Sequence, residues 1–394
     1  YIPPERLEPR IAATLHSYRQ CIACGACLAA CPVYTAARTS FGGPLAMRIL
    51  STFHQDPRDA APRLEQAVLR GLYNCLTCAS CYAVCPHEIP VHLGVLAMRR
   101  DAFQKGLAPP KLLDVADAIS DPEIGNPLYA PRSERGEWVR GLSPSPRARL
   151  LLFAGCMASY ADREGVRSLA RLLEIAGVEY QVLGDKEPCC GMPLLLAGDV
   201  EGARRQAQML REEIKRRGVE AIVTPCPSCF RMLRKEYPEA LGIDLGVEVL
   251  HSSQLLLKLI RAGAIRPVSR FDAIVVFHDP CDLGRHMSVF EEPREVLRSV
   301  PGLRLVEMLN GRHHRYSRCC GAGGDLRIVD PELSLRIAEL RLGDIPPKAE
   351  VVAHACPTCK IQFTEAMARR GRAVPNMSIQ EILLRSVVDD EQLG

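Results

Sequence analysis

The spacing of its cysteines constrains this 394-residue chain more than any other feature. The chain has 18 cysteines. Near the N-terminus the pattern C-x2-C-x2-C-x3-C-P occurs twice, and the remaining cysteines fall into two similar sets. Disulfide frameworks belong mainly to small secreted domains that lack an adequate core, and a chain of this length has room for an ordinary core. The arrangement therefore predicts metal centres rather than disulfides.

The N-terminal motifs predict two [4Fe-4S] cubane clusters with crossed ligation. In such a motif three cysteines ligate one cluster, and the fourth, followed by proline, ligates the other. We therefore expect one cluster on Cys21, Cys24, Cys27 and Cys85. We expect the second on Cys75, Cys78, Cys81 and Cys31. Structural zinc is the alternative, although zinc sites do not require the fourth cysteine and the proline twice over.

The remaining cysteines form a duplicated pattern of a single cysteine, a Cys-Cys-Gly and a C-P-x-C. The first set is Cys156, Cys189, Cys190, Cys226 and Cys229. The second set is Cys281, Cys319, Cys320, Cys356 and Cys359. The Cys-Cys-Gly and C-P-x-C cysteines of the first set recur 130 residues further on, and the single cysteine recurs after 125. Such self-similarity indicates an internal duplication.

Short apolar runs alternate with amphipathic ones after residue 147, which predicts α/β units. Expected strands are 148–154, 178–183 and 221–224, then 271–277, 304–309 and 350–353. Expected helices are 160–175, 201–217, 293–299, 331–342 and 361–370, with 62–72 and 91–104 nearer the N-terminus. Because the cysteines follow predicted strands, we expect them to gather at the carboxyl edges of the sheets.

The same patterns predict three domains. Residues 1–108 form a two-cluster ferredoxin-type domain, and residues 109–146, with seven prolines, form an extended linker. Residues 147–265 form a first cysteine-rich module (module 1), and residues 266–394 form a second (module 2).

This organisation resembles the CCG-domain iron–sulfur proteins, which include the B and D subunits of heterodisulfide reductase, the glycolate oxidase iron–sulfur subunit and the C subunit of anaerobic glycerol-3-phosphate dehydrogenase. The order of domains is most similar to the D subunit of heterodisulfide reductase. The long spacing from Cys31 to Cys75 resembles the α-helical ferredoxin domain of succinate dehydrogenase iron–sulfur subunits. The resemblance implies an α+α/β fold, with an α-helical two-cluster ferredoxin domain followed by two duplicated α/β CCG modules in pseudo-twofold relation.

The resemblance also implies cofactors and activity. Each five-cysteine set is expected to hold a noncubane [4Fe-4S] cluster, with the ten cysteines of both sets at the catalytic site. Zinc in one module is the alternative. The expected function is that of a heterodisulfide-reductase-like subunit, which passes electrons from the cubanes to two facing noncubane clusters that reduce or form a disulfide. The alternative is an electron relay between a flavin-dependent 2-hydroxyacid (glycolate or lactate) or glycerol-3-phosphate dehydrogenase and quinone.

Histidines and arginines accumulate around the cysteines of module 2. They are His278, His286, His313, His314 and His354, with Arg285, Arg312, Arg315 and Arg318. Side chains of both types donate hydrogen bonds to cluster sulfur or serve structural roles. Asp282 stands where histidine is frequent in the family, which puts a proton-handling role at that position in doubt. The run Gly321–Gly324 is no dinucleotide fingerprint, because it follows paired cysteines and lacks the downstream acidic residue.

The composition excludes some classes of binding partner. A formal charge of +4 is too balanced for a nucleic-acid-binding face. No window approaches the roughly 18 consecutive apolar residues of a membrane span. Without a flavin or nicotinamide motif, the chain is expected to exchange electrons with another redox protein, such as a membrane cytochrome b, a flavoprotein or a hydrogenase. The expected location is the cytoplasm, or the inner face of the membrane through a partner.

Overall fold

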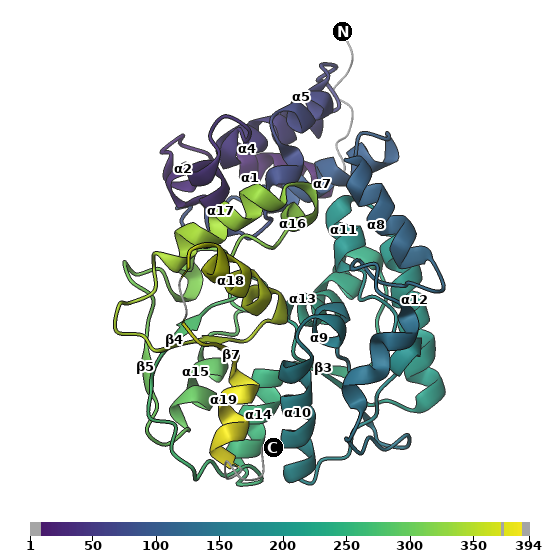
Figure 1. Cartoon of the computed structure of the whole chain (residues 1–394). Helices are drawn as coiled ribbons and strands as arrows, with labels where there is room; N and C mark the ends of the chain where they lie inside the picture. The colour runs from purple at the N-terminus through teal and green to yellow at the C-terminus, as the bar shows by residue number, and fades with distance from the viewer. Residues whose placement is uncertain (1–8, 372–373, 388–394) are drawn as a thin grey trace.

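The computed structural model describes residues 9–371 and 374–387. Its N-terminal part is helical and lies across one end of both cysteine-rich modules (Figure 1). The elements are α1 (Pro9–Arg19), α2 (Ala26–Ala30), α3 (Pro32–Ala36), α4 (Gly43–His54), α5 (Arg63–Leu69), η1 (Leu72–Asn74), α6 (Ser80–Ala83) and α7 (Val91–Gln104). The expected helix 91–104 is confirmed as α7, and the expected helix 62–72 is present as α5 followed by a 3-10 turn.

Module 1 contains a three-stranded parallel sheet in the order β1-β2-β3. Its strands are β1 (Leu150–Leu152), β2 (Ala221–Thr224) and β3 (Glu248–His251). Its helices are α9 (Cys156–Tyr160), α10 (Arg163–Ile175), α11 (Met192–Ala197), α12 (Val200–Arg217), α13 (Pro227–Arg231), the π-helix η4 (Met232–Leu241) and α14 (Ser252–Arg261), with the short η3 (Gly184–Lys186). The expected strand 178–183 is reduced to an isolated bridge between Gln181 and Leu151, because the chain pairs with β1 at that point alone.

Module 2 contains a four-stranded parallel sheet in the order β5-β4-β6-β7. Its strands are β4 (Ile274–His278), β5 (Arg304–Val306), β6 (Val351–His354) and β7 (Asn376–Ser378). Its helices are α15 (Glu291–Arg298), η5 (His314–Tyr316), α16 (Leu326–Val329), α17 (Pro331–Leu342), α18 (Pro357–Arg369) and α19 (Ile379–Val387). The strands β4, β5 and β6 confirm the three expected ones, with bounds that differ by at most three residues.

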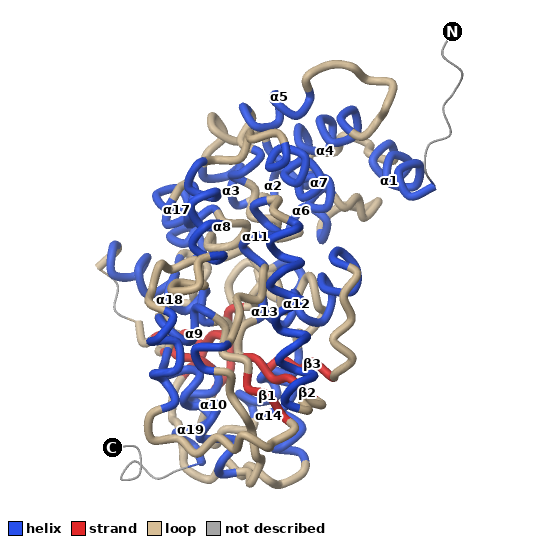
Figure 2. Tube along the Cα trace, turned by 90° about the vertical axis from the view of Figure 1, so that its right-hand side faces the viewer, coloured by secondary structure: helices blue, strands red, loops and turns tan. Residues whose placement is uncertain are grey.

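The two modules share one topology, which confirms the duplication. In each, the first strand pairs with the middle strand, which pairs with the last, and the segment on the far side of the first strand is β5 in module 2 and the Gln181 bridge in module 1. Their packing is reciprocal: α14 of module 1 lies on α15 of module 2, and α19 of module 2 lies on α10 of module 1 (Figure 1). The strands, red in Figure 2, lie away from the N-terminal helices.

The segment 109–146 is not an extended linker. It contains helix α8 (Pro110–Ser120) and the 3-10 helix η2 (Arg132–Val139). Pro110 occupies the first helical position, where the missing N–H and the fixed φ of proline are tolerated, so the proline count did not prevent a helix. Val115, Ile119 and Trp138 are buried in the same core as module 1. Leu112 is buried in a second core, which the N-terminal domain shares with module 2. This segment therefore packs against all three domains.

None of the helices within residues 9–371 and 374–387 has the length and apolar character needed to cross a bilayer.

Candidate metal centres

The N-terminal cysteines line two separate cavities. One is lined by Cys31, Cys75, Cys78 and Cys81. The other is lined by Cys21, Cys24, Cys27 and Cys85. Each cavity joins three cysteines of one motif with the last cysteine of the other, and this is the grouping that crossed ligation of two cubanes requires. Residues with positive φ, Ala23, Gly25, Thr77 and Ala79, turn the two loops around their cavities.

The two cavities differ in access to solvent. Cys24 of the outer cavity is exposed, and its neighbour Ile22 is 63% exposed. The inner cavity is walled by apolar side chains such as Phe41 and Met47, which are at most 1% exposed. A metal centre in the outer cavity would therefore be accessible from the protein surface, whereas one in the inner cavity would be shielded.

The five cysteines of each module gather at the carboxyl ends of parallel strands. Cys156 follows β1 and Cys226 follows β2, while Cys281 and Cys356 follow β4 and β6 in the same way. Glycine is required beside these sites. A Cβ on Gly155, where φ is +74°, would stand 2.8 Å from the Cys229 sulfur. The predicted convergence at the sheet edges is therefore what the structure shows.

Sulfur atoms within each set approach one another closely without forming disulfides. The Sγ atoms of Cys281 and Cys319 are 3.9 Å apart, and those of Cys359 and Cys320 are 3.3 Å apart. Hydrogen bonds from Cys319 and Cys359 lower the pKa of Cys320 well below its ordinary value. Cys189 and Cys229 lower the pKa of Cys190 in module 1 in the same way. All 18 cysteines of the chain are free, so the thiols of both sets are available as metal ligands.

Interactions between thiols of different groups indicate how the cysteine groups follow one another. A hydrogen bond from Cys319 of module 2 lowers the pKa of Cys78, which lines the inner cavity, to about 5. The pKa of Cys356 in module 2 is raised overall. A hydrogen bond with Cys359 lowers it, but burial and the charge of Cys226 in module 1 raise it by more. Burial and the charges of nearby thiols, Cys27 of the outer cavity among them, raise the pKa of Cys81 in the inner cavity. The cysteine groups therefore follow one another in the order outer cavity, inner cavity, module 2 and module 1.

Arg99 of α7 lies fully buried where the three domains meet. Its guanidinium donates hydrogen bonds to four backbone carbonyls, those of Leu72, Cys75, Leu196 and Gly324. Leu196 belongs to module 1 and Gly324 to module 2, whereas Leu72 and Cys75 belong to the loop of the inner cavity. One side chain therefore holds that loop against both modules.

Module 2 also closes over the loop of the inner cavity through two residues expected near the cysteines. Arg285 Nε donates to the Cys78 carbonyl at 2.6 Å, and His286 Nε2 lies 2.9 Å from the Thr77 carbonyl oxygen. Burial lowers the pKa of His286 well below the ordinary value, so its ring is neutral. Both side chains act on the backbone of the loop.

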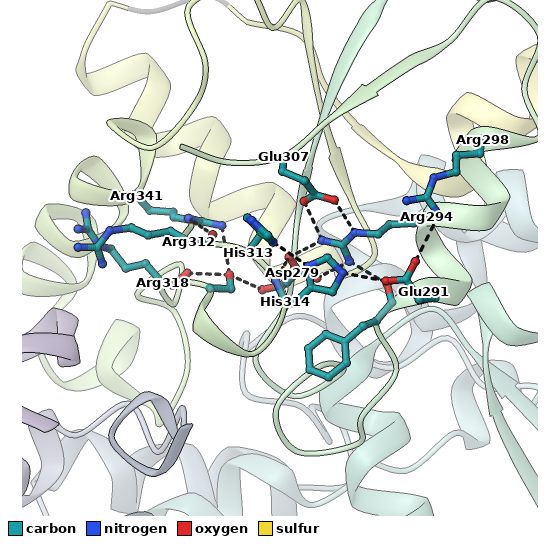
Figure 3. Close-up of polar contacts among 12 residues, drawn as sticks. Asp279, Glu291, Arg294, Arg298, Glu307, Arg312, His313, His314, Arg318 and Arg341 are labelled. Carbon is teal, nitrogen blue, oxygen red and sulfur yellow. Dashed lines mark hydrogen bonds and ion pairs between the residues drawn. The ribbon is translucent and has the colours of Figure 1, made fainter. Parts of the chain in front are cut away.

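Other predicted histidines and arginines form a network beside the centre in module 2 (Figure 3). Asp279 accepts hydrogen bonds from both Nη groups of the fully buried Arg294. It also accepts one from the His314 backbone N–H at 2.9 Å. The His314 ring reaches Glu291, at 2.8 Å. His313 contacts the His314 ring, Arg315 donates to the Ala83 carbonyl, and Arg312 and Arg318 pair with Asp344. This network fixes the loop that leads into Cys319.

Asp282 links the two modules. Its Oδ2 accepts from the Ser228 hydroxyl at 2.6 Å, and its Oδ1 pairs with the buried Arg231 at 3.0 Å. Ser228 lies inside the C-P-x-C loop of module 1, so the aspartate next to Cys281 holds the cysteine loop of the other module. A carboxylate suits these two donors, which accounts for aspartate at this position.

Asp282→Asn is expected to lower the free energy of unfolding by about 1–3 kcal/mol. The buried Arg231 would keep its ion pair with Glu236 but lose the one with Asp282. Thermal denaturation under anaerobic conditions measures the effect. Asp272→Asn, which removes an exposed ion pair with Arg270, serves as the control and should behave like the wild type. Equal midpoints for both variants would contradict the role of Asp282.

Asp325 is a buried carboxyl that follows Gly324 in the loop over the inner cavity. Burial raises its pKa to about 7, although Arg99 opposes the shift. Its Oδ2 has no hydrogen-bond partner among the described residues. The folded protein therefore binds this proton more tightly than the unfolded chain, and the free energy of unfolding falls as pH rises from about 4 to about 7.

Asp325→Asn is expected to remove that dependence. At pH 8 the variant should be more stable than the wild type by about 2–4 kcal/mol, and the difference should shrink toward pH 5. Asparagine also tolerates the left-handed backbone at this position, where φ is +59°. Denaturation midpoints across pH 5–8 test this expectation, and a difference independent of pH would refute it.

Comparison with known proteins agrees with this geometry. A cysteine-rich domain of the CCG type matches residues 150–234 and 275–364, and a 4Fe-4S dicluster domain matches residues 17–89. The D subunit of dihydromethanophenazine:CoB–CoM heterodisulfide reductase from Methanosarcina acetivorans is 32% identical, with 89% of each chain covered. Its counterpart from Methanosarcina barkeri is 30% identical, with 90% of each chain covered. The B subunit of a fumarate reductase (CoM/CoB) from Methanothermobacter marburgensis is 31% identical over 98% of this chain and 76% of its own.

Fold, cysteine geometry and these matches define an iron–sulfur oxidoreductase component, with a ferredoxin-type unit followed by two CCG modules. The chain belongs to the family of the heterodisulfide reductase D subunits. The resemblance drawn from the cysteine motifs is thereby confirmed.

Proposed function

We propose that the chain holds four [4Fe-4S] clusters and works as the disulfide-converting component of a redox complex. In this proposal the outer and inner cavities hold cubanes on the crossed cysteine groups, and the five-cysteine sets of modules 1 and 2 hold noncubane clusters. The observation that supports the proposal is the series of cysteine groups, linked by the Cys78–Cys319 hydrogen bond and by the electrostatic effect of Cys226 on Cys356.

The residues present fit such clusters. All 18 cysteines are free, and eight of the ten in the modules are buried. Each cavity and each module gathers thiols with no disulfide, and iron binds such cysteines as thiolates. When bound, the clusters supply one-electron transfer between the partner and the disulfide. The chain itself orders the four sites and shields the inner ones from water.

Metal analysis with an activity assay tests this proposal. About sixteen iron and sixteen acid-labile sulfide atoms per chain are expected, four for each cluster, without zinc. Protein with that content should reduce a low-molecular-weight disulfide when supplied with a strong one-electron donor such as reduced viologen. A full iron content with no thiol product would overturn the disulfide chemistry, and about eight iron atoms with one zinc would overturn the four clusters.

A pure electron relay is the second candidate, serving a flavin-dependent 2-hydroxyacid or glycerol-3-phosphate dehydrogenase that feeds quinone. The exposed Cys24 edge of the outer cavity favours it, because such an edge suits exchange with another protein. The partner protein that co-purifies with the chain discriminates the two. A flavoprotein would support the relay, and a b-type cytochrome or a hydrogenase would support the disulfide reaction. In either case we propose a cytoplasmic location, with any membrane attachment made through the partner.

A further inference from the structure

His278 ends strand β4, three residues before Cys281, and is fully buried. Its Nδ1 accepts a hydrogen bond from Arg341 Nε at 3.3 Å. Arg341 is itself buried and is held by Asp344 at 3.0 Å and by the Arg312 carbonyl at 2.9 Å (Figure 3). A guanidinium is always protonated, so the nitrogen that faces it carries a lone pair. The single proton of the neutral His278 ring is therefore on Nε2.

This Nε2–H lacks an ordinary acceptor. Among the described residues this Nε2–H makes no hydrogen bond, although an unpaired buried donor is costly. A ring nitrogen of His278 and the sulfurs of Cys320 and Cys359 lie within 4.8 Å of one another. Because Arg341 occupies Nδ1, these sulfurs are left as the acceptors for Nε2–H. The same tautomer argues against His278 as a metal ligand, since Nε2 would need a free lone pair.

Module 1 lacks this donor. Phe153 stands three residues before Cys156, as His278 stands before Cys281. Phe153 is fully buried, and its ring offers no N–H to a sulfur. At this position the two duplicated sites therefore differ in the presence of one N–H donor, although their cysteines correspond one to one.

We propose that His278 is a positioning residue that donates its Nε2–H to the Cys320 and Cys359 sulfurs and makes the centre of module 2 easier to reduce than that of module 1. The proposal rests on the proposed function, because it needs a cluster in each module. A hydrogen bond to cluster sulfur stabilises the more negative, reduced form, and burial strengthens it. Since Cys319 lies against Cys78, the more easily reduced centre is the one adjacent to the inner cavity.

The test compares His278→Phe, which copies module 1, with His278→Gln, which keeps an N–H donor. Redox titration of the anaerobic, cluster-loaded protein is followed by electron paramagnetic resonance, and loss of a signal in Cys359→Ser assigns the centre of module 2. At a fixed potential the ratio of reduced to oxidised centre should fall about tenfold in His278→Phe, the effect of losing one charge-assisted hydrogen bond. This ratio should fall less in His278→Gln. The corresponding ratio for the centre of module 1 should stay the same in both variants.

His354→Thr is the matched control. His354 is as buried as His278, pairs with it in register on β6, and lies two residues before Cys356, where module 1 has Thr224 before Cys226. This variant should leave the ratio unchanged. An unchanged ratio in His278→Phe with full iron content would overturn the inference and leave the proposed function intact. Absence of iron from module 2 of the wild type would overturn both.

Pulsed electron paramagnetic resonance on wild-type protein labelled with 15N-histidine gives a readout that needs no variant of His278. The reduced centre of module 2 should couple to one exchangeable proton and one histidine nitrogen, whereas the centre of module 1 should not. Absence of both couplings in module 2 would overturn the inference even if His278→Phe failed to fold.

Discussion

Arg99→Met is expected to lower the free energy of unfolding by at least about 4 kcal/mol and to loosen the inner cavity. The change leaves four buried carbonyls without their donor, and each unsatisfied group costs about 1–3 kcal/mol. The carbonyls belong to all three domains, so the lost hydrogen bonds are those that hold the domains together where they meet. Anaerobic denaturation, followed by circular dichroism and by the visible absorbance of the clusters, measures both effects.

Arg100→Met is the matched control for this experiment. Arg100 is the next residue of α7, and its half-exposed side chain bonds only to Asp101 among the contacts described. Its removal should change stability by no more than about 0.5 kcal/mol. A similar effect of the two substitutions would show that Arg99 does not hold the junction.

Paired cysteine substitutions should separate crossed from sequential ligation. Cys31→Ala combined with Cys75→Ala takes two ligands from one cubane, so we expect loss of about four iron atoms and one intact cubane signal. Cys31→Ala combined with Cys21→Ala takes one ligand from each cubane, so both signals should change. Iron analysis and electron paramagnetic resonance give the readout. The reverse outcome would show that each motif ligates its own cluster.

Much of the fold follows from local sequence signals. The periodic helix 91–104 and the strands before Cys226 and Cys356 are visible in the sequence because apolar pattern and length agree. The short strands β3 and β7 were not predicted, because three or four residues carry too little pattern and are stabilised by pairing with the middle strand. Helix α8 was missed because its prolines were read as breakers.

In the candidate site, too, some residues have a local sequence signal and others do not. Repeated spacing identifies every cysteine, since chelation demands residues of one type at fixed separations. Arg99 and Asp325 belong to no motif, and their importance arises from contacts across more than two hundred residues, such as Arg99 with Gly324. Likewise, the proton on His278 Nε2 is decided by Arg341, which is 63 positions away. Such long-range partners leave no local signal in a single sequence.

The proposed function requires four iron sites in series through the chain. An anomalous difference map at the iron absorption edge, from crystals grown without oxygen, tests it most directly. We predict four separate groups of iron peaks, at the outer cavity, at the inner cavity, beside Cys319 and Cys320, and beside Cys189 and Cys190. Iron confined to the two N-terminal cavities, or a zinc edge at either module, would contradict the account.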